Sequence, residues 1–402
     1  MQRRVVITGC GVVTAAGTEL DPFWNALMAG TCFIGPLRHF SCPGMEPLTG
    51  SEVDLPPLDA GEEDATRGRC AQLTLAAARR ALTDAGVRAG APELEGAGVV
   101  IGTTLGEERQ VGDLSDRWAT GGPSSVDPGF FSRSDNHRLA ALVARRHGLG
   151  GPTLVSATAC SSGNAALAWA YEQVASGGAD VMVAGGADAL TRSIYTGFLR
   201  MNALSKSICH PFDRRLDGVS FGEGAGLVVL EELDHARRRG AAMYAEIPGY
   251  GVSNDAHHIT APDPNGEGTV AAIRQALATS GTPLDSVDYV SAHGTGTPYN
   301  DVAETKAMKA VFGERARRVP ISSIKSMLGH TNGAASGIEA VACALALRHQ
   351  AVPPTANLLE PHPECDLDYV PGKGRSMPVS TCLNLSAGFG GFNVCVVIQR
   401  AP

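Results

Sequence analysis

The chain has 402 residues, of which 44% are hydrophobic and 18% are charged. This composition excludes a disordered chain, because enough apolar side chains are present to offset the entropy lost on ordering. The net charge of -8 argues against nucleic acid as the main partner. No run of 18 or more apolar residues is present, so the sequence predicts no membrane span.

Short β-branched runs alternate with alanine-rich segments along the chain. In chain order we predict a strand, a helix and three further strands, at residues 5–8, 71–85, 99–101, 179–184 and 226–230. Gly86 ends the helix. The alternation predicts βα units and a mostly parallel sheet. Residues 42–65 and 106–128 are rich in Gly, Pro, Asp and Glu and are expected to be surface insertions.

Cysteine usage and the first residues bear on the cellular compartment. Ten cysteines are present, but no two of them form a CxxC pair. Neither a disulfide-stapled fold nor a zinc ribbon is therefore indicated, and we expect no metal site. The opening segment MQRRVVITGC has an apolar run too short for a secretory signal, so we interpret it as a buried first strand. We expect a cytoplasmic location.

Two segments far apart in the chain resemble each other. Residues 154–160, LVSATAC, lead into the helical pattern SSGNAALAWAYEQV, and residues 321–330, ISSIKSMLGH, lead into TNGAASGIEAVACALAL. Both are typical of a strand, a tight turn and an alanine-rich helix. This weak repetition indicates two similar halves, which we place at residues 1–240 and 241–402.

The turn in the first of these segments holds Cys160, followed by the small residues SSGN. The first N–H groups of a helix are unpaired, and together with the helix dipole they favour a thiolate and lower the pKa of a cysteine. Cys160 is therefore a candidate nucleophile. A buried structural cysteine is the alternative interpretation.

Two histidines and a glycine-rich turn also follow or precede apolar runs. His293 lies in VSAHGTGTP and His330 in KSMLGH. Each histidine alone could be an ordinary loop or core residue, but strand ends are where α/β folds place chemistry. Residues 388–393, GFGGFN, suit a tight turn that presents a backbone N–H inward as part of an oxyanion hole. No GxGxxG before a helix and no GxxxxGK[ST] occurs, so no nucleotide site is predicted.

Four blocks, ATACSSGNAAL, HGTGTPYND, KSMLGHTNGAASGIEA and GFGGFN, resemble the active-site blocks of the β-ketoacyl-acyl-carrier-protein synthases. The resemblance extends to RRVVITGCGVVTAAG, HPFDRRLDGVSFGEGAG and AVPPTANL. It is strongest to synthases of type II and to ketosynthase subunits of bacterial type II polyketide systems. It implies an α/β thiolase fold, in which two βαβαβαββ halves form a five-layered α/β/α/β/α body that is usually dimeric.

The resemblance also implies a reaction, the decarboxylative condensation of an acyl group with malonyl-acyl carrier protein to give a 3-ketoacyl product. Cys160 would hold the acyl group as a thioester, while His293 and His330 bind the malonyl thioester and stabilise its enolate. Backbone N–H groups of Cys160 and Phe389 would form the oxyanion hole, with Phe389 also gating the acyl pocket.

Further residues match the family's supporting positions. Lys325 and Glu339 match a pair beneath His330, and of these two we count Lys325 among the catalytic residues. Asp301 matches a structural carboxylate after the first histidine loop. The resemblance implies no cofactor, because substrates arrive on the phosphopantetheine arm of an acyl carrier protein. The partner subunit would be a second copy or a chain-length-factor-like protein. Retention of Cys160 argues against this chain being the non-catalytic subunit itself.

Some residues depart from the pattern of fatty-acid synthases. Residues 131–138, FSRSDNHR, are polar where apolar pocket residues are usual, and we take Ser134 and Asp135 as candidate pocket residues together with Leu105 and Phe392. A solvated or subunit-facing position is the alternative for this segment. These departures favour specialised metabolism. The polar segment from Ser134 to His137 also motivates a second hypothesis: an acyltransferase or intramolecular cyclase that uses Cys160 without chain elongation.

Carrier proteins of this kind are acidic, so a chain with a net charge of -8 needs a local basic patch to bind one. The candidate residues flank the tunnel mouth that the resemblance implies; they are Arg67, Arg69, Arg200 and Lys206. An ordinary solvated surface charge is the alternative interpretation for each of them.

Overall fold

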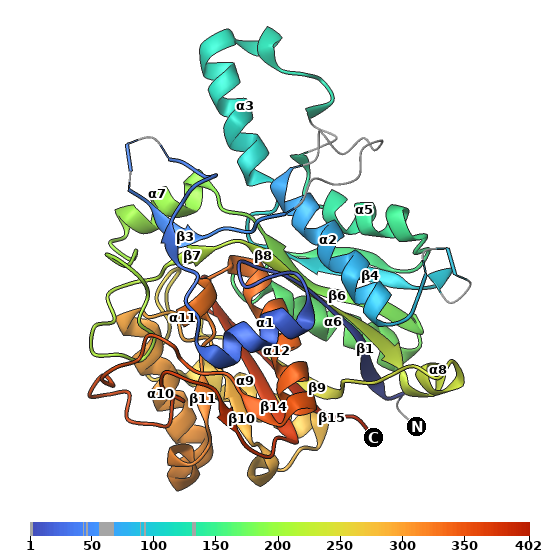
Figure 1. The fold of residues 1–402 in the computed structure, drawn as a ribbon, viewed down its shortest axis with the longest axis vertical. Coiled ribbons are helices and arrows are strands. Elements are labelled where there is room, and N and C mark those ends of the chain that lie inside the picture. The colour runs from blue at the N-terminus through green and yellow to red at the C-terminus, as the bar shows by residue number, and fades with distance from the viewer. Residues whose placement is uncertain are drawn as a thin grey trace.

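The computed structural model describes residues 3–42, 44–45, 47–55, 68–88, 90–91, 94–130 and 134–402. Ten strands form one continuous sheet, in which β1 (Val5–Val13) and β9 (Ala245–Asn254) pair antiparallel and join the two halves of the chain (Figure 1). On the far side of β1 follow β8 (Gly224–Glu232), β6 (Val181–Asp188), β4 (Gly98–Gly102) and β5 (Thr153–Ser156). On the far side of β9 follow β15 (Phe392–Arg400), β14 (Thr381–Gly388), β10 (Tyr289–Ser291) and β11 (Ile321–Ser322).

The two halves of this sheet have the same topology. With the five strands of each half numbered in chain order, both halves read 1-5-4-2-3 from the centre outward. In both, the two outer pairs are parallel and the two inner pairs are antiparallel. The duplicated fold is confirmed, but the expected mostly parallel sheet is wrong. An apolar run indicates that a strand is buried on both faces and carries no information on its direction.

Helices cover both faces of each half-sheet and build five layers (Figure 1). The central layer consists of α6 (Ser162–Ser176) and α12 (Ala335–His349), which lie between the half-sheets. One outer layer holds α2 (Arg69–Asp84) and α5 (Arg138–His147), and the other holds α9 (Glu267–Ser280) and α10 (Pro298–Phe312). The predicted helix at residues 71–85 is α2, which begins two residues earlier.

The two central helices approach each other at glycines. A Cβ added at Gly163 of α6 would lie 2.7 Å from the backbone nitrogen of Gly337 in α12, a contact that no side chain allows. Every residue of α12 from Ala335 to Leu347 is buried. Because α6 follows Cys160 directly and α12 begins shortly after His330, this contact brings the two repeated segments together.

The remaining elements lie around this core. Among them, α3 (Glu108–Gly121) projects from the body and has no buried residue, as expected for an insertion (Figure 1). The other α-helices of the described ranges are α1 (Leu20–Ala29), α7 (Arg192–Arg200), α8 (Leu233–Arg238) and α11 (Lys325–Leu328). Two small sheets contain β2 (Gly35–Pro36), β3 (Thr49–Ser51) and β7 (Phe221–Gly222), and β12 (Ala351–Val352) and β13 (Arg375–Ser376). None of the helices in the described ranges is both long and apolar enough to cross a bilayer.

Candidate active site

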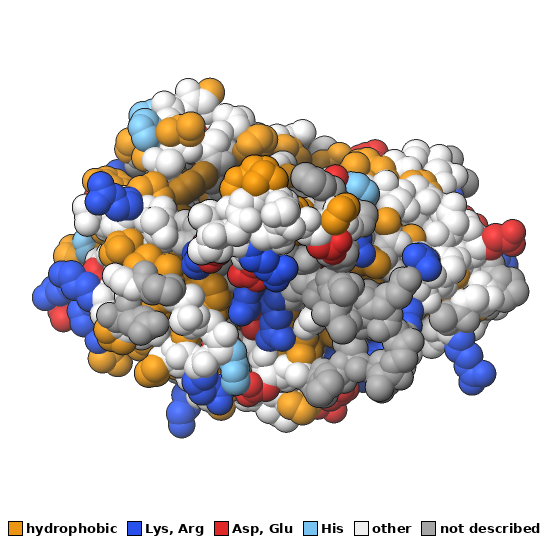
Figure 2. Space-filling model, turned by 90° about the horizontal axis from the view of Figure 1, so that it is seen from above, with side chains coloured by type: hydrophobic (Ala, Val, Ile, Leu, Met, Phe, Trp, Pro, Cys, Tyr) orange, Lys and Arg blue, Asp and Glu red, His pale blue; other side chains and the backbone are white. Residues whose placement is uncertain are grey.

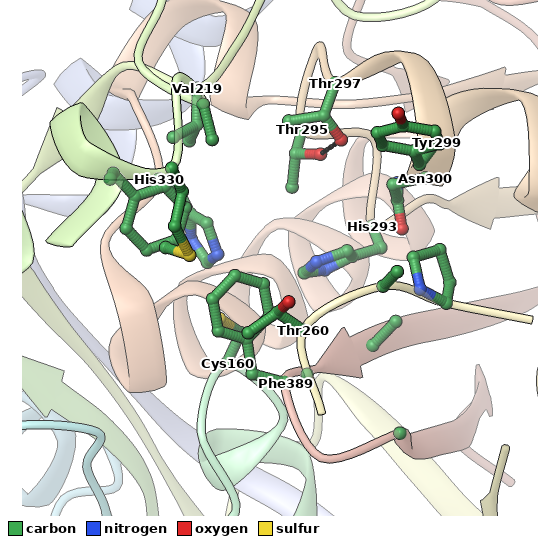
Figure 3. Close-up of a pocket in the computed structure, with 18 of the residues that line it drawn as sticks. Cys160, Val219, Thr260, His293, Thr295, Thr297, Tyr299, Asn300, His330 and Phe389 are labelled. Atoms are coloured by element: carbon green, nitrogen blue, oxygen red, sulfur yellow. Dashed lines mark hydrogen bonds between the residues drawn. The ribbon is translucent and has the colours of Figure 1, made fainter. Parts of the chain in front are cut away.

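A cavity of about 200 Å³ lies where turns from both halves meet. Its wall includes Cys160, His293, His330 and Phe389, so the structure brings together the four positions singled out from separate blocks of the sequence. The two imidazoles face the cavity from opposite sides, and the ring of Phe389 lies in front of Cys160 (Figure 3). The hydroxyls of Thr295 and Thr297, bonded to each other at 2.9 Å, also line it.

Cys160 stands on a tight turn between β5 and α6, formed by residues 158–162 and called the nucleophile turn below. Ala159 has a φ of +50°, in the left-handed region that residues with a Cβ seldom occupy. The N–H groups of Ser161 and Ser162 donate to the carbonyls of Thr158 and Ala159 at 3.2 and 3.1 Å. These bonds hold the strained residue in place, and Cys160 remains partly exposed to the cavity.

The thiol of Cys160 is less acidic than the sequence led us to expect. Burial raises its pKa to about 12, while the positive charge of Lys325 acts in the opposite direction and Asp188 adds to the rise. The expectation of a thiol made anionic by the helix start is therefore not met, because burial raises the pKa of the thiol by more than the charge of Lys325 lowers it. At neutral pH the thiol is protonated and must lose its proton in the reaction.

The two histidines meet edge to face, with ring centroids 5.4 Å apart at an angle of 84°. The backbone N–H of Asn332 donates to Nδ1 of His330 at 3.2 Å. The ring proton of a neutral His330 is therefore on Nε2, which is buried and has no hydrogen-bond partner among the described residues. Burial, followed by the charge of Lys325, lowers the pKa of both imidazoles well below the ordinary value.

A buried ion pair lies beside the histidines. Nζ of Lys325 is 2.5 Å from Oε1 of Glu339, and both side chains are almost fully buried. Burial raises the pKa of Glu339, and Lys325 opposes that rise. The structure thus places Lys325 and Glu339 together, as the resemblance implied.

Two carboxylates of α10 hold the loop that carries His293. Asp301 accepts the backbone N–H groups of Thr295 and Gly296, and burial raises its pKa to about 6. Glu304 accepts those of His293 and Gly294 at 2.7 and 2.9 Å, and burial raises its pKa to about 7. Sequence reasoning missed Glu304, although its position one helical turn after Asp301 was a usable signal.

The glycine turn brings Phe389 to the cavity. The ring of Phe389 stacks on that of Phe198, with centroids 5.3 Å apart and an interplanar angle of 5°. Gly390 and Gly391 have φ values of +84° and +80°, which glycine adopts without strain. A Cβ at Gly388 would lie 3.2 Å from the backbone nitrogen of Cys160, so this turn and the nucleophile turn are in direct contact.

The four candidate pocket residues are not among those that line this cavity. Leu105 is half-buried, and Phe392 is 37% exposed at the start of β15. Asp135 pairs with His137 at 2.8 Å, with a side chain that is 56% exposed in the single chain. Ser134 precedes it and is half-buried. The structure therefore favours a solvated or subunit-facing segment here rather than a polar wall of the cavity.

The candidate docking residues differ in their surroundings. Arg67 lies outside the described residues. Arg69 forms an ion pair with Glu223 at 2.6 Å and is only 21% exposed, which corrects the expectation of a free surface charge. Arg200 and Lys206 are exposed, and Met201 and Ala203 between them line the cavity. Within the described part of the chain, no group of three or more His, Cys, Asp or Glu side chains could hold a metal ion.

Comparison with known families gives two adjoining matches. The N-terminal domain of beta-ketoacyl synthase matches residues 2–236, and the C-terminal domain of beta-ketoacyl synthase matches residues 244–359. Together they cover most of the chain, including Cys160, His293 and His330 but not the glycine turn that carries Phe389.

Individual relatives match over nearly their full length. The chain is 39% identical to "3-oxoacyl-[acyl-carrier-protein] synthase 2" of Synechocystis sp., over 99% of this chain and 98% of the relative. It is also 39% identical to "Tetracenomycin polyketide synthase ketoacyl synthase alpha subunit" of Streptomyces glaucescens, over 99% of this chain and 97% of the relative. Among solved structures, "The ishigamide ketosynthase/chain length factor" superposes with a TM-score of 0.95 at 36% identity, covering 100% of both chains. A type II polyketide ketosynthase in complex with its acyl carrier protein superposes with a TM-score of 0.93 at 32% identity, and the match covers 100% of both chains.

Proposed function

This chain belongs to the beta-ketoacyl synthase family, and from that premise we propose that it joins an acyl group to malonyl-acyl carrier protein with loss of CO2. The observation that carries this proposal is the meeting of one thiol and two neutral imidazoles in a single cavity. The product is a 3-ketoacyl thioester on the carrier protein.

In the first half-reaction Cys160 attacks the thioester carbonyl of an acyl carrier protein. A bond forms between Sγ and the carbonyl carbon, the bond from that carbon to the phosphopantetheine sulfur breaks, and the thiol proton ends on the released carrier thiol. The N–H groups of Cys160 and Phe389 stabilise the oxyanion of the tetrahedral intermediate. The contact between Gly388 and the nucleophile turn supports this assignment.

In the second half-reaction the malonyl group loses CO2. The carbon–carbon bond to the carboxylate breaks, and its electron pair forms an enolate whose oxygen accepts a hydrogen bond from Nε2–H of His330, with His293 on the other side. The enolate carbon then attacks the acyl carbonyl on Cys160. A carbon–carbon bond forms, the bond to Sγ breaks, and the released thiolate takes up a proton from water, which balances the negative charge left when the carboxylate departs as CO2.

Lys325 has an electrostatic role in this scheme. A neutral imidazole can donate from Nε2 and does not trap the malonyl carboxylate as an ion pair. Burial is the main cause that lowers the pKa of both histidines, and the buried charge of Lys325 adds to it, so both rings stay neutral. Glu339 balances that charge at 2.5 Å. Glu304 and Asp301 hold the His293 loop without touching the substrate.

The experiment that tests the function follows the two half-reactions separately. Wild-type protein incubated with acyl carrier proteins should gain the acyl mass on Cys160, and malonyl carrier protein should then give CO2 and a 3-ketoacyl product. Cys160→Gln should abolish acylation while leaving or raising CO2 release. Cys32→Gln, which changes an exposed thiol outside the cavity, is the matched control. Acylation without an extended product would contradict the proposal.

The alternative of an acyltransferase or cyclase without elongation loses its motivation in this structure. It depended on a polar pocket wall formed by the segment from Ser134 to His137, and no residue of that segment lines the cavity. We therefore assign condensation alone.

The proposed partners are an acidic acyl carrier protein and a second subunit, either another copy or a chain-length-factor-like protein. The similarity to a ketosynthase/chain length factor structure, at a TM-score of 0.95, supports the second of these and a place in specialised metabolism. Substrates would be carried on phosphopantetheine, so we propose no further cofactor. The cytoplasmic location stays a prediction.

A further inference from the structure

Asp188 is a buried carboxylate that neither the sequence motifs nor the proposed reaction uses. It is the last residue of β6 and has no exposed surface. None of the ion pairs in the described part of the chain includes it. A carboxylate that is buried without a cation is costly unless hydrogen bonds replace its water shell. Its partners therefore indicate what it stabilises.

One group of partners is the loop of residues 103–106, called the Thr103 loop. Oδ1 of Asp188 accepts the Thr103 hydroxyl at 2.7 Å and the N–H groups of Leu105 and Gly106 at 3.0 and 3.1 Å. Oδ2 accepts the N–H of Thr104 at 2.7 Å. Four donors from one short loop thus converge on a single side chain, which fixes the conformation of that loop.

The Thr103 loop in turn contacts the nucleophile turn. The hydroxyl of Ser162 lies 3.1 Å from the carbonyl oxygen of Thr103, and it accepts the N–H of Thr158 at 2.9 Å. A Cβ added at Gly102 would lie 2.2 Å from the carbonyl oxygen of Ser162, so the two segments are in backbone contact. Any shift of the Thr103 loop is therefore transmitted to the turn that carries Cys160.

The fifth partner of Asp188 belongs to the other half of the molecule. Oδ2 accepts the N–H of Gly333 at 2.7 Å, in the segment 329–334 called the His330 loop. The preceding residue, Asn332, donates the backbone N–H that fixes the proton of His330 on Nε2. A Cβ at Gly333 would lie 2.6 Å from the backbone nitrogen of Thr104. The bond from Gly333 therefore anchors the loop that orients His330.

We propose that Asp188 is a positioning residue that holds the nucleophile turn and the His330 loop in register across the boundary between the two halves. The proposal rests on the catalytic roles proposed above for Cys160 and His330. The negative charges of Asp188 and Glu339 also act on Cys160 and favour the protonated thiol, whereas the positive charge of Lys325 opposes them.

The test replaces Asp188 by asparagine, which has the same shape but no charge and turns an NH2 group toward backbone N–H donors. Two quantities are measured in the purified full-length protein: CO2 release from malonyl carrier protein, and the rate at which iodoacetamide alkylates Cys160 between pH 8 and 10. We expect CO2 release to fall at least tenfold, because Gly333 loses its acceptor. We expect alkylation to become at least threefold faster, because removal of the negative charge raises the thiolate fraction.

Asp180→Asn is the matched control, since it removes an exposed carboxylate that pairs with Arg3 and directly precedes the same strand. A folded Asp188→Asn protein that leaves either quantity within twofold of wild type overturns the proposal. If that variant does not fold, Thr103→Val is tested instead, because it removes the hydroxyl that donates to Asp188. The proposal requires that CO2 release by Thr103→Val falls at least threefold, and a wild-type rate overturns it. If wild-type protein releases no CO2, the proposed function fails, and the alkylation comparison still tests Asp188.

Discussion

The proton on His330 is fixed by a backbone group rather than by another side chain. Because the N–H of Asn332 occupies Nδ1, only Nε2 can donate into the cavity. Asn332 itself has a φ of +52°, so a strained residue follows His330 just as the strained Ala159 precedes Cys160. Strain at both positions is consistent with turns shaped for chemistry rather than for stability.

Replacing His330 by phenylalanine should separate the two half-reactions. Phenylalanine retains a flat ring but has no Nε2–H, so the enolate loses one donor. We expect CO2 release from malonyl carrier protein to fall about 100- to 1,000-fold, as for loss of a single oxyanion-stabilising donor, while acylation of Cys160 changes much less. Radiolabelled CO2 and intact mass measure the two steps. His349→Phe, a change at a ring stacked on Trp24 outside the site, is the control, and equal losses in both steps would refute the assignment.

The raised pKa of Glu304 makes a prediction about stability. Between pH 4.5 and about 7 the folded carboxyl keeps a proton that the unfolded one has released, because its pKa rises from 4.5 to about 7. The contribution of Glu304 to the free energy of unfolding therefore falls as pH rises through this window. Glu304→Gln cannot titrate, so its stability relative to wild type should rise between pH 5 and 8, by at most about 3 kcal/mol.

Urea unfolding of both proteins at several pH values measures this difference. Glu267→Gln, a change of an exposed carboxylate on α9, serves as the control. A difference between wild type and Glu304→Gln that stays constant from pH 5 to 8 would show that Glu304 has the same pKa in both states.

At the scale of elements, the sequence predicted where strands and helices lie better than how they pair. The apolar runs at residues 99–101 and 226–230 correspond to β4 and β8, yet only β4 has parallel neighbours. Cys160, His293 and His330 could be predicted because each stands in a distinctive block. Glu304 was missed, although its place one helical turn after Asp301 was a usable signal. Asp188 could not be predicted, since its role depends on backbone N–H groups that come from other segments.

The contact between α6 and α12 is the element-scale feature on which the site depends. Gly163→Ala would place a Cβ 2.7 Å from the backbone nitrogen of Gly337, so one of the two helices must move. We expect a loss of about 1–3 kcal/mol in the free energy of unfolding, as for overpacked cores, together with reduced acylation of Cys160. Gly197→Ala on α7, where nothing lies within 4 Å of the new Cβ, should be neutral or slightly stabilising. Equal stability of the two variants in urea would contradict this packing argument.

At the scale of the whole molecule, the net negative charge opposes binding of an acidic carrier protein. The chain has 41 acidic and 33 basic residues, so an acidic partner is repelled at long range and attracted only locally. On the side that carries α3 and α7, Lys and Arg side chains lie among hydrophobic patches (Figure 2). Arg200 and Lys206 flank residues that reach the cavity, and the half-exposed Leu199 and Met201 beside them offer apolar contact.

Reversing both charges, with Arg200→Glu and Lys206→Glu, should therefore weaken binding of the carrier protein about tenfold at low salt. The effect should shrink as ionic strength rises, because exposed charges are screened beyond a Debye length. The matched control is Arg237→Glu with Arg238→Glu, which makes the same change in net charge on α8, an element far from α7 (Figure 1). Binding is measured by fluorescence anisotropy of a labelled carrier protein at several salt concentrations. If both double variants weaken binding equally, net charge alone governs the encounter and the mouth of the cavity is not the docking site.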